Sequence, residues 1–340
     1  MRGVENMISF DAIIGNPPYQ IMDGGAQASA TPVYNTFVEI AQKINPEYLS
    51  IIMPSRWMTG GKGLDKFRRK MIRDKHIIKL VDYFDASACF PNVEIKGGVC
   101  YFLWNKSVED KCEIITHIDN SILQSHRYLC ENSDEFFIRD NRLISIKEKV
   151  AVLAEPTFNT LVSSMKPYGI RGDAFKDTEK YGLPEFSSEV IEDGYSIIGL
   201  NEKLRRVVKY MGKDYPLPKR DMLHDYKIFI TRNYGIGELG EIPSSPVLAE
   251  PGMACTETFV QIGPFSNQQE MENCFSYMKT KFFRLMVGIR KHDQGAGKSV
   301  YSLVPLQDFN KSWTDEELYK KYNLSPEDID FIEQKIKKYD

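Results

Sequence analysis

The stretch Phe10-Asp11-Ala12-Ile13-Ile14-Gly15-Asn16-Pro17-Pro18-Tyr19 decides the fold of the N-terminal part of the chain. Its first half is a compact apolar run, which predicts a short buried strand over 10–14 of the kind found in a covered parallel sheet. The two prolines that follow cannot donate ladder hydrogen bonds, so the strand has to end there. Because ligands bind at the carboxyl ends of strands in open α/β sheets, an amide, a stiff carbonyl and an aromatic ring are expected together at a binding edge.

These three groups suit the activation of an amino group on a nucleobase. The lone pair of such an amine is delocalised into the ring, and two acceptors that hold its N–H bonds favour a pyramidal nitrogen and stabilise the charge that develops on it. The side-chain oxygen of Asn16 and the carbonyl of Pro17 are the candidate acceptors. Tyr19 is a candidate platform for a base turned out of the duplex. A simple proline turn after a strand is the alternative.

Length and composition are those of an ordinary globular protein. The 340 residues, 42% hydrophobic and 27% charged, allow about two domains. No apolar run reaches the roughly 18 residues that span a bilayer, and the N-terminus has no apolar signal core, so a cytoplasmic protein without membrane contact is expected. Six cysteines without a C-x-x-C pair favour free thiols over a metal site. With a net charge of −3, any DNA-binding surface has to be local.

Helices and strands are expected to alternate after Tyr19. A Gly-rich loop leads into a helix over 33–43, and apolar residues at helical spacing between 64 and 71 predict an amphipathic helix with a basic outer face. That face is either solvated or contacts DNA phosphates. The candidate backbone contacts are Arg56, Lys62, Arg68 and Arg69. The strands expected in this part cover 48–53, 77–84, 99–104 and 112–116.

Several of these segments resemble adenine-specific DNA methyltransferases of the gamma arrangement, and in particular the methylase portion of type IIG restriction-modification proteins. The matching segments are 16–19, 34–39, 49–57, 90–93 and 97–102. The resemblance implies an α/β fold with a partial doubly wound, Rossmann-like methyltransferase sheet. It also implies methyl transfer from S-adenosylmethionine to the amino group of a flipped adenine in double-stranded DNA, as part of a restriction-modification system.

The resemblance assigns two more aromatic residues to the site. Phe90 would stack on the flipped base opposite Tyr19, and Phe37, together with Asn16, would border the cofactor. Ordinary core packing is the alternative explanation for both phenylalanines. The reaction requires no metal ion, and no general base is evident from the sequence.

The sequence changes character near residue 151, where short β-rich runs with frequent glycine, proline and basic residues begin. This part resembles a target-recognition domain of the α+β class, and one helix is expected over 268–287. Its expected strands cover 196–200, 227–231, 247–248 and 259–262. The predicted domains are the C-terminal half of a methyltransferase domain over 1–118, a connecting segment over 119–150, a DNA-recognition domain over 151–312 and C-terminal helices over 313–340.

No S-adenosylmethionine loop of the form Phe/Asp-x-Gly-x-Gly precedes Asn16. The cofactor-binding half of the sheet is therefore expected to be missing, or to be supplied by a separate chain. This leaves a non-catalytic DNA-specificity fragment as one alternative. A nuclease subunit is another, because Asp85, Glu94 and Lys96 resemble the Asp…Glu-x-Lys pattern of magnesium-dependent nucleases.

The run 235–240 matches G-x-G-x-x-G, the pattern of dinucleotide-binding loops. However, Pro243 and Pro246 follow where that motif needs the start of a helix, so a turn is expected instead.

Overall fold

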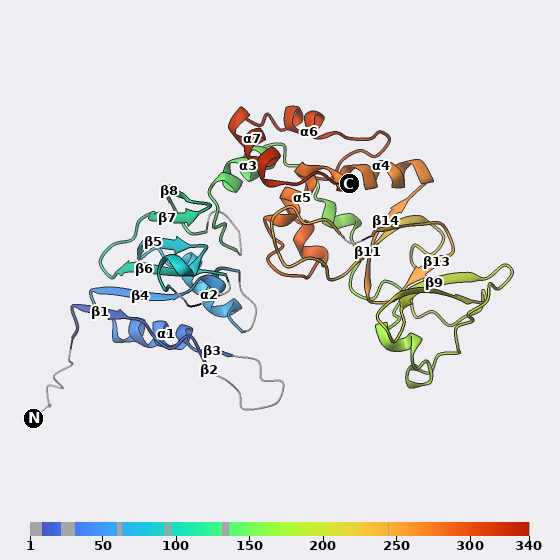
Figure 1. The fold of residues 1–340 in the computed structure, drawn as a ribbon, viewed down its shortest axis with the longest axis horizontal. Coiled ribbons are helices and arrows are strands. Elements are labelled where there is room, and N and C mark those ends of the chain that lie inside the picture. The colour runs from blue at the N-terminus through green and yellow to red at the C-terminus, as the bar shows by residue number, and fades with distance from the viewer. Residues whose placement is uncertain are drawn as a thin grey trace, which may run out of the picture. The chain divides into compact units, whose positions relative to one another are not determined.

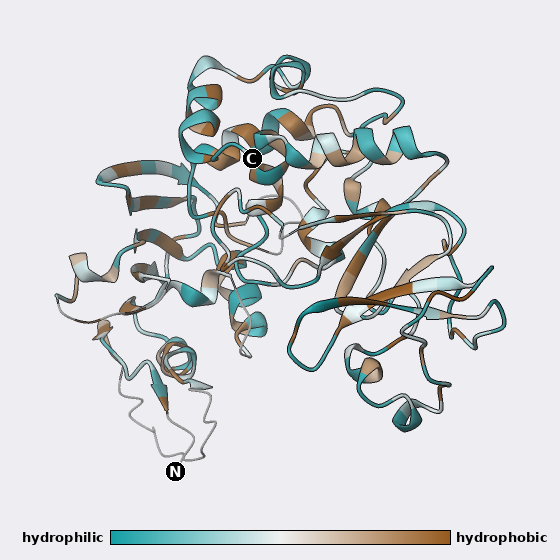
Figure 2. Ribbon diagram, turned by 45° about the vertical axis from the view of Figure 1, so that its right-hand side comes forward, coloured by the Kyte–Doolittle hydropathy of each residue, from teal (hydrophilic) through white to brown (hydrophobic). Residues whose placement is uncertain are grey.

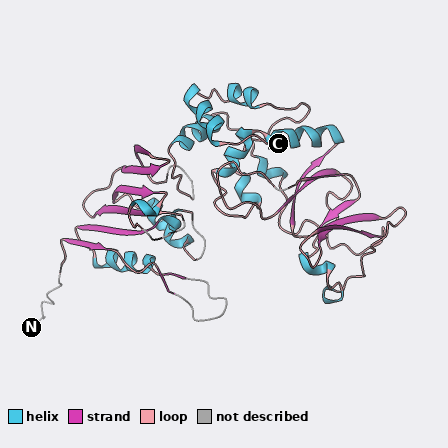
Figure 3. Cartoon of the chain, viewed as in Figure 1, coloured by secondary structure: helices cyan, strands magenta, loops and turns pink. Residues whose placement is uncertain are grey.

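The computed structural model describes residues 9–21, 31–59, 63–91, 93, 95, 97–130, 136–243 and 245–339. The chain forms two compact units, Met1–Ile144 and Ser145–Asp340. Each unit has its own sheets and helices (Figure 3). The prediction of a mixed α/β fold is therefore confirmed.

The first unit is built on a six-stranded mixed sheet, whose order β1-β4-β6-β5-β7-β8 can be followed in Figure 1. The neighbours β1 and β4 are parallel, as are β5 and β7, whereas β6 and β8 run against their neighbours. The strands are β1 (Ala12–Gly15), β4 (Tyr48–Pro54), β5 (Ile77–Tyr83), β6 (Val99–Asn105), β7 (Cys112–Ile118) and β8 (Ser121–Arg127). A separate two-stranded ribbon pairs β2 (Gln20–Ile21) with β3 (Thr31–Pro32).

One face of this sheet carries the core of the unit. The helices α1 (Tyr34–Ile44) and α2 (Asp65–Arg73) contribute to a single buried cluster with alternate residues of β4 and β6. Residues that alternate to the other face of these strands, such as Ser50 and Tyr101, are only half-buried. The helices carry hydrophobic and hydrophilic residues side by side, as expected when one side of each is buried (Figure 2).

The strand predicted over 10–14 was expected to be buried, and this is wrong. It forms as β1, but it lies at the edge of the sheet and pairs only with β4. Ile14 is 83% exposed and Phe10 is also exposed, because the part of the chain that the structure describes places no strand on the outer side of β1.

The second unit combines two three-stranded sheets with helices. The sheets have the orders β10-β9-β13 and β12-β11-β14, and residues of both join one buried cluster. Their strands are β9 (Tyr195–Leu200), β10 (Arg206–Met211), β11 (Tyr226–Thr231), β12 (Val247–Ala249), β13 (Met253–Cys255) and β14 (Phe259–Phe265). The helices are α3 (Arg142–Ala151), which crosses from the first unit into the second, α4 (Gln268–Lys279), α5 (Lys281–Gly288), α6 (Asp315–Lys321) and α7 (Pro326–Lys335).

The single helix expected over 268–287 is in fact two helices. Thr280 ends α4 with extended backbone angles, and its hydroxyl accepts the N–H of Phe283 as the N-cap of α5. The C-terminal helices predicted over 313–340 form as α6 and α7, and Thr314 and Ser325 each close a capping box at the start of one of them.

The loop over 235–240 wraps around a carboxylate of its own chain. The N–H groups of Ile236, Gly237 and Glu238 all donate to Oε1 of Glu241. The other oxygen of Glu241 pairs with the buried ammonium of Lys291. The turn predicted there is confirmed, and the loop serves to hold this internal ion pair.

None of the helices formed by the described residues is long and apolar enough to cross a membrane.

Candidate active site at the carboxyl edge of the first sheet

Asn16 lies directly after the last residue of β1, at the sheet edge where the parallel strands β1, β4, β5 and β7 end. Its side chain is exposed and makes no hydrogen bond within the described part of the chain. Pro17 is half-buried, and Pro18 is exposed. The amide therefore has its hydrogen-bonding capacity free at the edge where the sequence predicts a ligand.

Tyr19 and Phe90 lie next to each other at this edge. Their ring centroids are 6.5 Å apart, and the planes meet at 68°, edge to face. The backbone carbonyl of Tyr19 accepts the N–H of Val33, and Phe90 follows a short turn whose N-cap, Asp85, accepts from Ser87. The structure thus brings together the two predicted stacking residues. A base between two parallel rings would require one ring to turn.

Three buried polar atoms near this edge have no hydrogen-bond partner in the described structure: the hydroxyls of Tyr19 and Tyr34 and the side-chain oxygen of Asn35. Burial raises the pKa of both tyrosines. Buried polar groups are nearly always satisfied in proteins, so these atoms lack a partner that the described residues do not supply.

Phe37 lies on α1, close in sequence to these unpartnered groups, and its ring is 45% exposed. Core packing therefore does not account for it, because most of the apolar face of α1 is formed by other residues, among them Val38 and Ala41. Phe37 thus presents an accessible aromatic ring on the same helix as Tyr34 and Asn35.

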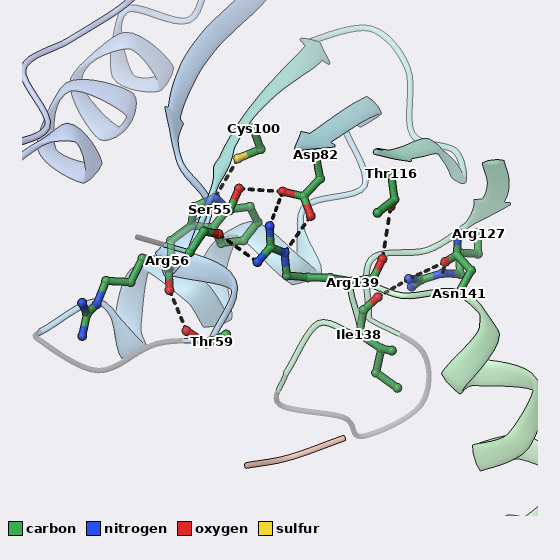
Figure 4. A network of polar contacts seen from close by, with 12 residues as sticks. Ser55, Arg56, Thr59, Asp82, Cys100, Thr116, Arg127, Ile138, Arg139 and Asn141 are labelled. Atoms are coloured by element: carbon green, nitrogen blue, oxygen red, sulfur yellow. Dashed lines mark hydrogen bonds and ion pairs between the residues drawn. The ribbon is translucent and has the colours of Figure 1, made fainter. Parts of the chain in front are cut away.

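A buried ionic network that sequence analysis missed holds the same edge together (Figure 4). The carboxylate of Asp82, at the end of β5, is fully buried. Arg139 donates to both of its oxygens, with Nε–Oδ2 at 2.7 Å and Nη2–Oδ1 at 2.9 Å. Ser55, after β4, donates to Oδ1 at 2.6 Å, and Arg139 also donates to the carbonyl of Gly97 at 2.9 Å. The network therefore joins the ends of β4 and β5 to the loop before β6.

At Gly98, the loop before β6 leaves no space for a larger residue. Gly98 has a φ of +83°, and a Cβ there would lie 2.0 Å from the carbonyl oxygen of Tyr83. The guanidinium of Arg139 stacks 3.9 Å from the ring centre of Phe84. Behind the network, the indole of Trp57 donates to the thiol of Cys100, whose pKa burial raises to about 12. These contacts form a rigid base for the candidate site.

Among the predicted DNA-backbone contacts, the structure distinguishes exposed arginines from one that is bound to neighbouring residues. Arg56 and Arg69 are exposed, and Arg56 points away from the ionic network in Figure 4. Arg68 is instead tied to its own unit, since it lies 3.1 Å from Asp65 and donates to the carbonyl of Thr59 at 2.8 Å. Lys62 lies outside the described residues. Of the nuclease pattern, only Asp85 is described, where it serves as an N-cap.

A cavity of about 370 Å³ lies at the opposite end of the sheet. It is lined by the first residues of β5 and β7, Ile77 and Cys112, together with the end of α2. Since Asn16 follows the last residue of a parallel strand, this cavity belongs to the other edge and does not form part of the candidate site.

The N-terminal part of the chain is similar to a known protein family. Residues 3–90, which contain Asn16, Tyr19, Phe37 and Phe90, match the family described as the Eco57I restriction-modification methylase. The resemblance to restriction-modification methylases that the sequence predicted is confirmed for this segment.

A curated relative agrees with this class. A protein of Mycoplasma pneumoniae (strain ATCC 29342 / M129 / Subtype 1), named an uncharacterized adenine-specific methylase, is 38% identical over 113 residues. The match covers 32% of this chain and 27% of that protein, so the chain spans only a minor part of the curated relative's length.

Solved structures of restriction-modification enzymes match a larger share of the chain at low identity. The type IIG restriction endonuclease BpuSI is 12% identical with a TM-score of 0.37, over 87% of this chain and 44% of that one. The type IIL enzyme MmeI, solved in complex with DNA, is 11% identical with a TM-score of 0.38, over 86% of this chain and 45% of that one.

Proposed function

We propose that this chain carries the catalytic edge of a DNA methyltransferase that methylates the exocyclic amino group of an adenine turned out of the duplex. The observation that carries the proposal is the free, exposed amide of Asn16 directly after β1, within a segment that matches a restriction-modification methylase family. S-adenosylmethionine supplies an electrophilic methyl group when bound. The same proposal places the reaction in a restriction-modification system.

Asn16 and Pro17 act on the amine. The side-chain oxygen of Asn16 and the backbone carbonyl of Pro17 each accept one N–H of the amino group, which turns its lone pair away from the ring and towards the methyl group. As the nitrogen gains positive charge, both acceptors stabilise it. Tyr19 and Phe90 hold the base by stacking, and Phe37 and Asn16 border the cofactor. The proton that leaves the nitrogen passes to solvent.

The DNA contacts are divided between the units in this proposal. Arg56 and Arg69, which are exposed, bind phosphates without sequence preference. Arg68 adds to them by moving away from Asp65, and Lys62 belongs to the same basic segment. The region 151–312 reads the target sequence, and 313–340 adds the last helices. The catalytic part predicted over 1–118 extends further than that bound, because β8 within the predicted connecting segment 119–150 pairs with β7 in the same sheet.

The proposal includes a separate polypeptide segment that completes the cofactor site. The outer edge of β1 has no partner strand among the described residues, and large apolar side chains are exposed along it and on α1. These are Phe10, Ile14, Phe37, Ile40 and Ile44. An open parallel edge with exposed apolar residues favours the addition of another strand. A non-catalytic DNA-specificity fragment is the second candidate, because the described residues offer only one border of a cofactor site.

Calorimetric titration of S-adenosylmethionine into the chain separates these two candidates. Heat of binding is expected for the methyltransferase, whereas absence of heat favours the non-catalytic fragment.

Transfer of a labelled methyl group to unmethylated genomic DNA then tests the mechanism. Asn16→Ala is expected to reduce transfer by more than 100-fold and to leave DNA affinity within about twofold, since the amide acts mainly on the transition state. Gln124→Ala, which removes an exposed amide at the far side of the same sheet, is the matched control with unchanged transfer. Transfer that survives Asn16→Ala contradicts the assigned role.

A further inference from the structure

We propose that the tip of the β9–β10 hairpin is a DNA wedge, in which Leu204 enters between base pairs while Lys203 and Arg205 bind the flanking phosphates. The inference rests on the proposed function for its ligand, double-stranded DNA, and it assigns a contact in the second unit. The label β9 in Figure 1 marks the strand that leads into this hairpin.

The hairpin tip is a well-defined turn. The strands β9 and β10 pair in antiparallel register up to Leu200 and Arg206. The side chain of Asn201 accepts the N–H groups of Lys203 and Arg205, both at 3.0 Å, and its backbone carbonyl accepts the N–H of Leu204 at 3.0 Å. The turn is thus fixed from inside by one asparagine, and the side chains that follow it are presented on a rigid support.

Leu204 is an unusual residue for this position. Its side chain is 74% exposed, and its φ is +56°, in the left-handed region that disfavours branched apolar side chains. At five of the other nine non-glycine positions with positive φ in the described chain, the residue is asparagine or aspartate, as expected for turns. A leucine here leaves an apolar side chain in water and strains the backbone, so neither folding nor solubility explains it. Such strain is typical of residues that act on a ligand.

The charges around Leu204 identify the class of ligand. Lys203 and Arg205 are both exposed beside it, and Arg206 follows, with Glu202 as the one nearby carboxylate of the turn. An apolar residue between two cations matches duplex DNA, where the gap between base pairs is apolar and the phosphates on either side are anionic. Proteins that insert a leucine between base steps unstack them, and a partly unstacked duplex releases a base more readily.

A second exposed residue of the same unit serves as a matched control. Val190 is 75% exposed, but its neighbours Glu189, Glu192 and Asp193 are acidic. Phosphates would be repelled there, so the structure predicts no DNA contact at Val190.

Binding of a fluorescein-labelled, mixed-sequence 30-base-pair duplex to the full chain tests the charges. Lys203→Ala with Arg205→Ala is expected to reduce the slope of log affinity against log salt by about 2, because two phosphate contacts are lost. Leu204→Gly is expected to lower affinity about tenfold without changing that slope. Leu204→Met should retain the affinity, as should Val190→Gly. The unfolding temperature of Leu204→Gly should not be lower than that of the wild type, since glycine removes the backbone strain.

Unwinding of a relaxed closed-circular plasmid in the presence of a topoisomerase tests the insertion itself. The wild type at saturation is expected to shift the linking number, and Leu204→Gly at saturation is not. An equal shift by both proteins, or equal affinity of both for the duplex, overturns the wedge. If the wild type binds no duplex, the wedge and the proposed function both fail. If Leu204-dependent binding is present but no methyl group is transferred, only the proposed function fails.

Discussion

Replacement of Arg139 by methionine is expected to lower the free energy of unfolding of the Met1–Ile144 unit by about 3 kcal/mol. The substitution removes two charge-assisted hydrogen bonds to Asp82 and one to the carbonyl of Gly97. It leaves the buried carboxylate with Ser55 as its remaining donor in the described structure. Loss of one partner of a buried ion pair costs about 3–5 kcal/mol, and the lower end applies because 14% of the Arg139 side chain is exposed to water.

Urea unfolding of the full chain measures this loss. The chain has three tryptophans, of which Trp57 and Trp104 lie in the first unit and Trp313 in the second. In a Trp313→Phe background, fluorescence therefore reports on the first unit alone. The control is Lys79→Met on β5, which breaks the exposed ion pair with Glu113 on β7. It should change the free energy of unfolding little.

A double-mutant cycle tests the reason for the loss. The double variant Asp82→Asn with Arg139→Met leaves neither charge of this pair buried. Its free energy of unfolding should therefore be about 2 kcal/mol higher than the losses of the two single variants, added together, predict. A cost below about 1 kcal/mol for Arg139→Met, or a coupling energy near zero, would refute the reasoning.

Three further predictions test other parts of the fold. Gly98→Ala should cost at least about 2 kcal/mol, because its Cβ would lie 2.0 Å from the carbonyl oxygen of Tyr83. Gly97→Ala, with a similar φ and open space, should cost about 1 kcal/mol. Urea unfolding compares the two variants, and equal costs would contradict the packing argument. Burial lowers the pKa of Lys227 from 10.5 to about 8. Between these pH values the unfolded chain binds more protons than the folded chain. The free energy of unfolding of the second unit should therefore rise from pH 8 to about 9.5, by up to about 1.4 kcal/mol per pH unit. Lys227→Met should remove this rise in thermal unfolding, and a rise that persists would assign it to another group. Thr314→Ala should cost about 1 kcal/mol through loss of the α6 cap, measured from Trp313 fluorescence, and no loss would show that the cap is redundant.

Local sequence patterns predicted the elements that depend on local physics. The strands over 48–53 and 99–104 are apolar runs, and they form as β4 and β6. By contrast, β8 (Ser121–Arg127) and β10 (Arg206–Met211) were not predicted, because each contains polar residues and is fixed by pairing with a neighbour. The exposed edge position of β1 also depends on what pairs with it, which its own residues do not encode.

The candidate site was predicted only in part, for the same reason. Asn16, Tyr19 and Phe90 carry a local motif or resemblance, and the structure places the two rings in contact. The ion pair of Asp82 with Arg139 joins residues 57 positions apart and has no local pattern. One signal was available: a carboxylate within the apolar run 80–84 requires a buried cationic partner. The sequence does not show which arginine that partner is.

The loop over 235–240 shows why a glycine pattern can match without its function. Its glycines do what they do in nucleotide-binding proteins, since they let successive backbone N–H groups converge on an oxyanion. Here the oxyanion is Glu241, and a Cβ at Gly235 would lie 2.2 Å from its carboxyl group. A glutamine at position 241 would leave the ammonium of Lys291 buried without its carboxylate, so the charge of one side chain holds both the lysine and the loop over 235–240 in place.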